Sequence, residues 1–419
     1  MSASEPAATK YSETRKGLPQ SFTAAHKIDY ALCGLIGLFP VLFITSLKLV
    51  LLLAVVGLFL SWRQQRGVPF DLGVAFVLCA QFALFFLLNT LLFESWEGNR
   101  FNTYAIALEA WIGTLIGLVV LSLYLRTERD IWPAWRDALP IGLLLSFAIM
   151  TVFYVSGVQG PRASAWAATT LTPPMWFLAL SLLSFAGFEH LSTAQRNLRF
   201  ALFMLAVLMS FYANARLIFL AWGLAAVVLS FWIVAQRPKG SRLRASLVLI
   251  FALFACVAVI VTLDQMGKGY TVSRMLKLWD ALRDPSQASE HFIRLKLWAA
   301  AWQVASQNIW LGIGQVNERE AIQEISQHSS WFRAHQTYLS YLVGGGILAL
   351  ISGLAFQATP LFAMPRGVPS SWWLAGGGFV AVCALNGLTD SVFQSYTNVQ
   401  GYCLITLLFL AAARIRTRP

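Results

Sequence analysis

Residues 331–341 read WFRAHQTYLSY and end the longest polar segment between two hydrophobic stretches of the chain, roughly residues 265–335. A helix-length apolar run begins directly after this segment. A polar loop that leads into such a run places His335 at a membrane surface, where the loop enters the bilayer. The rest of the chain decides on which side of the membrane this polar segment and His335 lie.

The composition is typical of an all-α polytopic membrane protein. Of the 419 residues, 58% are hydrophobic and 12% are charged, whereas soluble globular proteins have roughly 25% charged residues. The net charge of +12 does not indicate a nucleic-acid partner, because the basic residues are scattered over short loops between apolar stretches. That distribution is the one that membrane topology requires.

The hydrophobic runs predict about twelve transmembrane helices, since a span needs about 20 apolar residues. The first two share one long apolar stretch. If they form a single helix instead, the orientation of every later span in the membrane is inverted. We place the twelve spans at residues 29–45, 47–62, 70–93, 103–125, 138–157, 173–190, 198–213, 216–235, 245–264, 336–358, 371–391 and 398–414.

The distribution of positive charge favours twelve spans with both termini in the cytoplasm. In this arrangement the cytoplasmic segments hold 19 of the 31 lysines and arginines. The short outer loops hold only Lys48, Arg100, Arg162 and Arg216, and the remaining eight lie in the long loop. Cytoplasmic loops carry the excess of Lys and Arg, so the long loop is expected on the outer face, which is periplasmic in a Gram-negative cell.

This topology divides the chain into five parts. We expect an uncleaved first helix rather than a signal peptide, because no small-residue cleavage site follows a single short apolar core. The parts are a cytoplasmic tail (1–28), transmembrane helices 1–9 (29–264), a large periplasmic loop (265–335), transmembrane helices 10–12 (336–414) and a cytoplasmic tail (415–419).

The long loop is expected to be helical. Apolar residues recur at helical spacing between Val272 and Leu282 and again between Leu295 and Ala305, and a third, shorter helix is predicted at Glu318–Gln327. All five cysteines fall inside apolar spans and none lies in the loop. A disulfide framework or thiolate metal site is therefore excluded there, and no His or carboxylate cluster has metal-ligand spacing.

Two arginines on the outer face are candidates for binding an anion. Arg216 opens the eighth span against the positive-inside pattern, and a charge at the bilayer edge needs a partner or an anionic ligand. Its alternative role is that of a snorkelling interfacial arginine. Arg294 lies on the polar side of the second loop helix, where a solvated helix face is the alternative. An arginine fork binds phosphate oxygens bidentately, so two such residues on one membrane face would suit a diphosphate.

His335 is a candidate general base, because imidazole titrates near neutral pH and can take a proton from an attacking hydroxyl. The alternative is an ordinary hydrogen-bonded interfacial histidine, and His328 is a weaker candidate. Among the carboxylates in or near spans, Glu109, Glu189 and Asp390, we favour Asp390 because it lies on the same side as His335.

The sequence is similar to the O-antigen ligase and polymerase superfamily over roughly residues 200–355. The segment RLKLWAAAWQVASQNIWLGIGQ is followed by AHQTYLSYLVGGGILAL, and the topology agrees with that family. The residues that match its pattern are Arg216, Arg294, Trp298, Gly312, Gly314, His335 and Leu339. The chain departs from the pattern where Gln336 replaces an asparagine, where Ile309 and Trp310 stand in place of a proline, and where the Gly344–Gly346 run replaces an acidic residue.

The glycine triplets Gly344–Gly346 and Gly376–Gly378 are expected to permit close packing of helices. The resemblance implies a glycosyltransferase of the bacterial inner membrane, without cofactor or metal, that works by inversion. It would transfer O-antigen from undecaprenyl diphosphate to a sugar hydroxyl of lipid A–core on the periplasmic face. His335 would be the catalytic base and Arg216 and Arg294 would bind the diphosphate. Candidate supporting residues are Asp390, Gln336 and Arg333.

Two alternatives share the histidine loop, an O-antigen polymerase and a protein O-oligosaccharyltransferase, and the acceptor decides between the three. A different class is a lipid-linked glycan flippase or secondary transporter. Transporters carry charges deep within several spans and repeated halves. Here the notable charges cluster at one surface and no internal repeat is visible.

The first prediction concerns metals. If the arginines replace the divalent cation that many glycosyltransferases use, the purified enzyme keeps its full transfer activity in excess chelator. The measurement is the rate of glycan transfer with and without EDTA. Activity that disappears in EDTA and returns with added divalent cation would contradict metal independence.

Overall fold

The structure is a computed structural model, and it describes residues 24–61, 73–93, 101–125, 130–157, 172–213, 215–236, 258, 262, 289–315, 317–326, 334–388, 390 and 392–414. The predicted ninth span (245–264, apart from two single residues), the predicted loop helix at 272–282, His328 and Arg333 lie outside the described residues. The predicted cytoplasmic tails lie outside them as well, except for residues 24–28.

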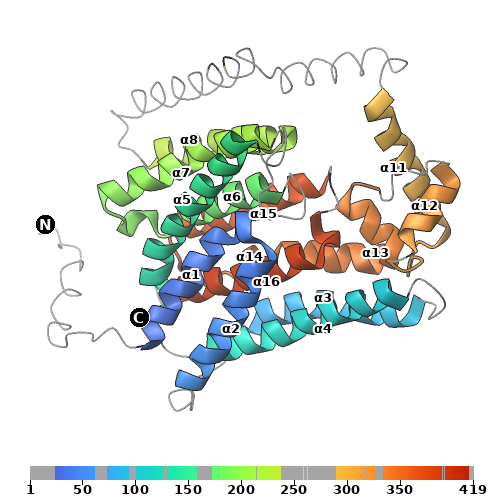
Figure 1. The fold of residues 1–419 in the computed structure, drawn as a ribbon, viewed down its shortest axis with the longest axis horizontal. Helices are drawn as coiled ribbons and strands as arrows, with labels where there is room; N and C mark the ends of the chain where they lie inside the picture. The colour runs from blue at the N-terminus through green and yellow to red at the C-terminus, as the bar shows by residue number, and fades with distance from the viewer. Residues whose placement is uncertain are drawn as a thin grey trace, which may run out of the picture.

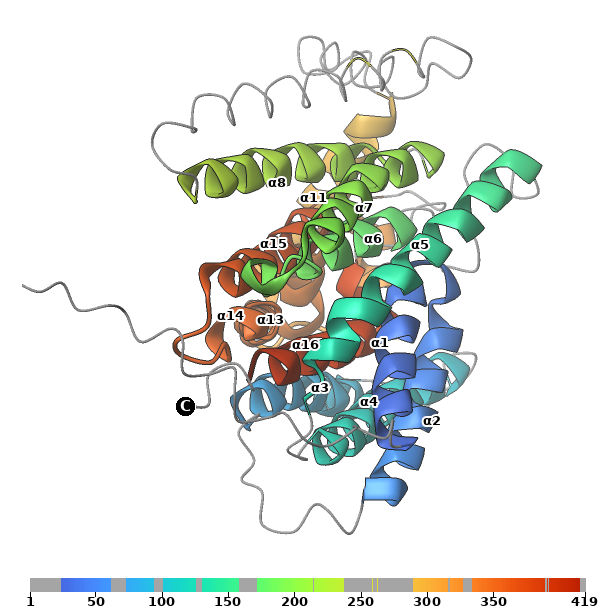
Figure 2. The same ribbon diagram turned by 90° about the vertical axis from the view of Figure 1, so that its left-hand side faces the viewer.

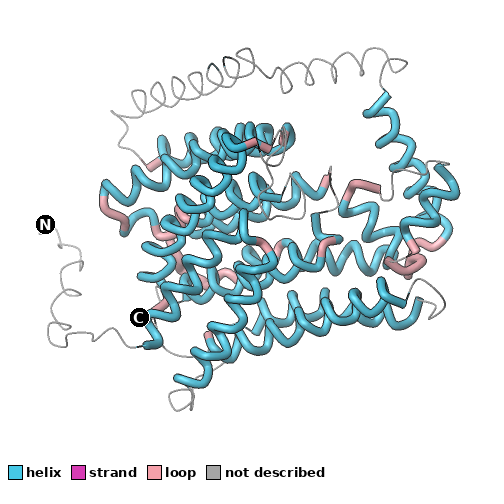
Figure 3. The backbone as a smooth tube through the Cα atoms, in the orientation of Figure 1, coloured by secondary structure: helices cyan, strands magenta, loops and turns pink. Residues whose placement is uncertain are grey.

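The described chain is helical throughout and contains no strand (Figures 1 and 3). Six of its helices are long and apolar enough to cross a membrane, which makes this a multi-pass membrane protein. The elements are α1 (Ala24–Leu42), α2 (Ile44–Ser61), α3 (Gly73–Phe93), α4 (Phe101–Tyr124), α5 (Trp132–Ser156), α6 (Thr172–Leu183), η3 (Phe188–His190), α7 (Thr193–Tyr212), α8 (Arg216–Ala235), α11 (Ser289–Gln307), α12 (Glu318–Ser326), α13 (Thr337–Gln357), α14 (Thr359–Phe362), α15 (Ser370–Gly387), η6 (Val392–Gln394) and α16 (Tyr396–Arg414).

The first apolar stretch forms a helical hairpin, not one long helix. Phe43 has a φ of 40°, in the left-handed region, which ends α1. The Tyr124 hydroxyl donates to Asp29 near the start of α1, and the Tyr124 ring also lies against Gly57 near the end of α2. Because the start of α1 and the end of α2 meet at one residue, the two helices run in opposite directions.

Two helices form the centre of the bundle. All residues of α6 are buried, and α16 is buried along most of its length. Figure 2 shows α16 between the other helices. Trp176 of α6 donates through Nε1 to the Asn398 side chain at 2.9 Å. A buried polar pair of this kind satisfies both groups and fixes the position of α16 against α6.

Helices α8 and α15 pack against each other with opposite directions. Near the end of α8, Trp232 and Gln236 donate to the Ser370 hydroxyl at the start of α15, at 3.2 and 3.3 Å. Helices of 20 and 18 residues are about 30 and 27 Å long. The start of α8 and the end of α15 therefore lie at the opposite surface of the bundle, which we call the loop face because α11 and α12 lie at that end (Figure 1).

The loop helices fold back onto α13. Helices α11 and α12 confirm the predicted loop helices near 295–305 and 318–327. A second hydrophobic cluster, separate from the main core, joins them to α13. Its buried members are Leu297, Ala300, Ala301, Val304, Ala305, Ile322, Ala334 and Val343.

Helix α13 is broken in its middle by glycines. Gly345 and Gly346 have non-helical backbones, with φ/ψ of −143°/15° and 66°/−160°. The backbone at residues 309–314 enters this break. Three hydrogen bonds close it: from the Ile313 N–H to Val343 O at 2.8 Å, from the Gly314 N–H to Gly344 O at 3.0 Å, and from the Ile347 N–H to Ile309 O at 2.7 Å.

We call residues 309–314 together with 343–347 the glycine crossing. The expectation that Gly344–Gly346 permits close packing of helices holds at Gly345, where a Cβ would meet Phe85 of α3 at 2.7 Å. At Gly344 and Gly346 the triplet instead admits a loop backbone. The second triplet does lie at helix contacts, since a Cβ on Gly378 would meet Leu182 of α6 at 3.1 Å and one on Gly376 would meet Phe409 of α16 at 3.3 Å.

The second prediction tests the glycine crossing. A Cβ on Gly346 would lie 2.2 Å from the Trp310 carbonyl group, and such a backbone conformation costs other residues roughly 1–3 kcal/mol. Gly346→Ala should therefore lower the free energy of unfolding by on the order of 3 kcal/mol, measured by SDS titration of the purified protein.

Gly377→Ala is the matched control. It lies in helical α15, and its Cβ would meet only Leu361 at 4.0 Å. An alanine there should leave stability unchanged or raise it by about 0.5–1 kcal/mol. Equal stability of the two variants would contradict the close approach at the glycine crossing.

Candidate functional site

The structure brings His335 and Asp390 together. His335 lies just before α13 and Asp390 just after α15, and Nδ1 of the imidazole is 3.7 Å from Oδ1 of the carboxylate. The side chains are 33% and 22% exposed, so both are partly screened from solvent yet accessible. The separation is longer than a hydrogen bond and is within the range of an ion pair when the imidazole is protonated.

Hydrogen bonds between side chains and the backbone hold this pair in place. The Thr337 hydroxyl donates to the Asp390 carbonyl at 2.8 Å, which joins the start of α13 to the segment after α15. The Gln336 side chain caps α13 by accepting from the Leu339 N–H at 2.6 Å. Gln336 thus has a structural role beside the candidate base, since a helix start leaves N–H groups that need acceptors.

Glu318 is a residue near this pair that sequence reasoning missed. It is 2% exposed, and its Oε1 accepts from the Ser340 hydroxyl at 2.7 Å and from the Ala334 N–H at 3.4 Å. The sequence signal is weak, because an acidic residue in the first turn of a helix is ordinarily a solvated cap.

Asn89 is a second missed residue, and it ties α3 to the glycine crossing. Its Nδ2 donates to the Gly344 carbonyl at 3.0 Å, and its Oδ1 accepts from the Gln315 N–H at 3.3 Å. Asn317 extends the same contact by donating to the Phe93 carbonyl at the end of α3, at 3.2 Å. An asparagine inside an apolar span was the available sequence signal.

The two predicted arginines lie on separate elements. Arg216 is the first residue of α8, so its backbone lies at the loop face, and its side chain is outside the described residues. Arg294 is half-buried in the first part of α11. Leu297, one turn further along α11, is buried in the same cluster as Ala334, the residue before His335. Arg294 is therefore on a helix that packs against the end of the loop, next to His335.

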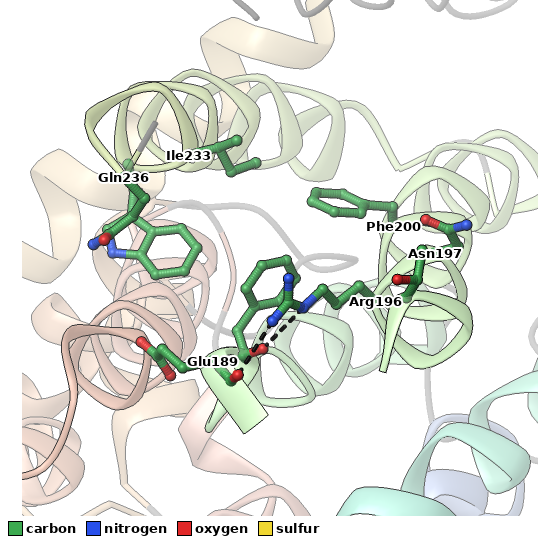
Figure 4. Close-up of a pocket in the computed structure, with 9 residues that line it drawn as sticks. Glu189, Arg196, Asn197, Phe200, Ile233 and Gln236 are labelled. Carbon is green, nitrogen blue, oxygen red and sulfur yellow. Dashed lines mark hydrogen bonds between the residues drawn. The ribbon is translucent and has the colours of Figure 1, made fainter. Parts of the chain in front are cut away.

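A hollow of about 540 Å³ lies at the other end of the bundle (Figure 4). It is lined by Phe188, Glu189, Thr193, Arg196, Asn197, Phe200, Trp232, Ile233 and Gln236. Since it adjoins the start of α15, it is about 27 Å from the Asp390 end of that 18-residue helix.

The two charged residues that line this hollow, Arg196 and Glu189, form hydrogen bonds with neighbouring parts of the chain. Arg196 donates to the carbonyls of Phe188 and Glu189, at 3.2 and 3.1 Å. The Glu189 carboxylate accepts from the Ser371 hydroxyl at 2.5 Å and from its N–H at 3.4 Å, so it caps α15. Glu189 therefore has a structural role, and Glu109 is exposed on α4.

Residues 201–353 match the family model described as O-antigen ligase. The match contains Arg216, Arg294, His335 and the glycine crossing, and it confirms the resemblance to the O-antigen ligase and polymerase superfamily, a group of membrane glycosyltransferases. The search of curated proteins found no match.

The third prediction concerns Asn89. Asn89→Ala removes the acceptor of the Gln315 N–H and one of the two donors to the Gly344 carbonyl, and an unsatisfied buried group costs roughly 1–3 kcal/mol. Amide hydrogen exchange should therefore speed up at residues 313–315 and 343–347. Asn197→Ala, an exposed amide on α7, is the control and should leave these amides unchanged. Unchanged exchange in Asn89→Ala would contradict the role of this side chain.

Proposed function

We propose that the protein is an O-antigen ligase. It transfers O-antigen polysaccharide from undecaprenyl diphosphate to a sugar hydroxyl of lipid A–core. The observation that carries the proposal is the His335–Asp390 pair, with its Nδ1–Oδ1 separation of 3.7 Å. His335 lies at the junction of loop and helix, inside the segment that matches an O-antigen ligase model, and Asp390 lies after that segment.

His335 acts as the general base. An Asp390 carboxylate that faces Nδ1 favours the tautomer with its proton on that nitrogen, and Nε2 is then the basic nitrogen. It takes the proton of the acceptor hydroxyl as the hydroxyl oxygen attacks the anomeric carbon of the donor. The bond between that carbon and the diphosphate oxygen breaks, and its electron pair leaves with the diphosphate. A single displacement of this kind inverts the anomeric centre.

Arg216 and Arg294 bind the diphosphate. The charge on the leaving diphosphate grows as the sugar–oxygen bond breaks, and preorganised donors in a site poor in water stabilise such charge by about 3 kcal/mol each. Arginine suits this task because its fork binds two phosphate oxygens at once. In this mechanism the two side chains supply the positive charge that a divalent cation supplies elsewhere.

The site works on the periplasmic face of the bacterial inner membrane. We propose twelve spans, both termini in the cytoplasm and a periplasmic loop at residues 265–335. The charge asymmetry of the short loops supports this orientation. Lipid-linked donor and lipid A–core both reach such a site from the outer leaflet of that membrane, so neither has to leave the bilayer.

The fourth prediction tests the base. His335→Ala should lower transfer to lipid A–core by roughly 10²–10⁴-fold, the usual contribution of a general base. Asp390→Asn should lower it less, because the imidazole remains. The measurement is transfer in vitro from undecaprenyl-diphosphate-linked glycan, with protein amount and thermal stability checked for each variant.

His190→Ala is the control, since His190 is exposed on η3 near the opposite end of the bundle. It should retain full activity. Normal capping of lipopolysaccharide by a well-expressed His335→Ala protein would remove the catalytic assignment. Elongation of a glycan lipid, or glycosylation of a pilin acceptor, in place of transfer to lipid A–core would identify a polymerase or protein O-oligosaccharyltransferase and overturn the ligase assignment.

A further inference from the structure

Glu318 is a buried carboxylate on α12, a helix whose other charged side chains are exposed. Its side chain is 2% exposed, whereas Arg319, Glu320 and Glu324 on the same helix are exposed. Burial of a carboxylate is unfavourable unless hydrogen bonds compensate for the lost water. The contacts that compensate therefore indicate what this side chain does.

Two of those contacts lie on either side of His335. Oε1 of Glu318 accepts from the Ala334 N–H, one residue before the histidine, at 3.4 Å. It also accepts from the Ser340 hydroxyl, in the first turn of α13, at 2.7 Å. One carboxylate oxygen thus joins the last loop residue to the start of the helix, with the candidate base between them.

The backbone of His335 needs such a restraint. Its φ of 49° lies in the left-handed region, which costs a residue other than glycine roughly 1–2 kcal/mol. A conformation of this kind persists only where surrounding contacts fix it. A relaxed backbone at this position would turn the imidazole away from Asp390.

The ionised form of Glu318 fits this environment. An ionised carboxylate only accepts hydrogen bonds, and both of these partners are donors. Glu318 is also the first residue of α12, where the helix dipole favours a negative charge. Both features suit a carboxylate that accepts hydrogen bonds through Oε1.

We propose that Glu318 is a positioning residue for His335. Its buried carboxylate fixes the left-handed turn that aims the imidazole at Asp390 and the acceptor hydroxyl. This inference rests on the proposed function, in which His335 is the base. Glu318 itself need not touch either substrate, and it acts through the backbone of the residue that does.

Kinetics separate this role from substrate binding. A misplacement of about 1 Å in a catalytic group can lower the rate on the order of 10²-fold. Glu318→Ala should therefore lower kcat by roughly 10–100-fold and leave KM for the lipid-linked donor within about twofold, since a misplaced base does not change how the diphosphate is held.

The conservative variant gives the second readout. Glu318→Gln keeps a carbonyl oxygen that accepts from Ser340 and Ala334, so kcat should recover to within about tenfold of the wild type, because a neutral acceptor forms hydrogen bonds roughly half as strong as a charged one. Ser340→Ala removes the shorter of the two contacts and keeps the carboxylate, and it should lower kcat in the same direction. Glu324→Ala, exposed on the same helix, is the matched control and should have no effect.

A double variant distinguishes failure of this inference from failure of the proposed function. In His335→Ala protein, adding Glu318→Ala should cause no further loss, because Glu318 acts only through the base. Full activity of Glu318→Ala and Ser340→Ala beside an inactive His335→Ala would overturn the positioning role and leave the base in place, as would an additive loss in the double variant. An active His335→Ala would overturn the base assignment itself.

Discussion

The rest of the site depends on the three backbone hydrogen bonds of the glycine crossing, which join residues 309–314 of the loop to residues 343–347 of α13. An unpaired N–H or carbonyl inside a bilayer costs several kcal/mol, so a membrane helix can be broken only where other groups replace its own bonds. The loop supplies those groups. His335 lies just before α13, and residues 309–314 follow α11, the helix that carries Arg294. The same bonds therefore also fix α11 relative to His335.

Polar side chains from neighbouring helices secure this arrangement on one face of the bundle. Asn89 joins α3 to the glycine crossing, and Thr337 joins α13 to Asp390 after α15. Each connects elements that are far apart in sequence. Polar groups also join elements at the opposite end of the bundle, where Glu189 accepts from Ser371 at the start of α15 and Arg196 donates to the Phe188 carbonyl. What distinguishes the loop face is the partly exposed His335–Asp390 pair, which these contacts hold in place.

Hydropathy and charge predicted most of the described helices and the common side of His335 and Asp390, because apolar runs and the position of basic loops are properties of the sequence alone. The sixth predicted span, 173–190, is an exception, since α6 ends at Leu183. The break in α13 could not be predicted in this way. Gly344–Gly346 lies inside one continuous apolar run, and glycine permits helix contact and loop entry equally well. The burial of Glu318 could not be predicted for a related reason, because it depends on how the segment at Ala334 and Ser340 folds against it.

Three unusual features of the described residues lie within one short part of the chain. The left-handed backbone of His335, the buried carboxylate of Glu318 and the break in α13 lie within 29 residues of one another along the sequence, from Glu318 to Gly346. Strain and buried charge are retained where neighbouring contacts fix them, and such features gather at functional sites. A base and a diphosphate clamp require only a hydroxyl and a leaving diphosphate, so they do not choose the acceptor. In the proposed mechanism, selection of the acceptor therefore comes from the surfaces that surround the base and the two arginines.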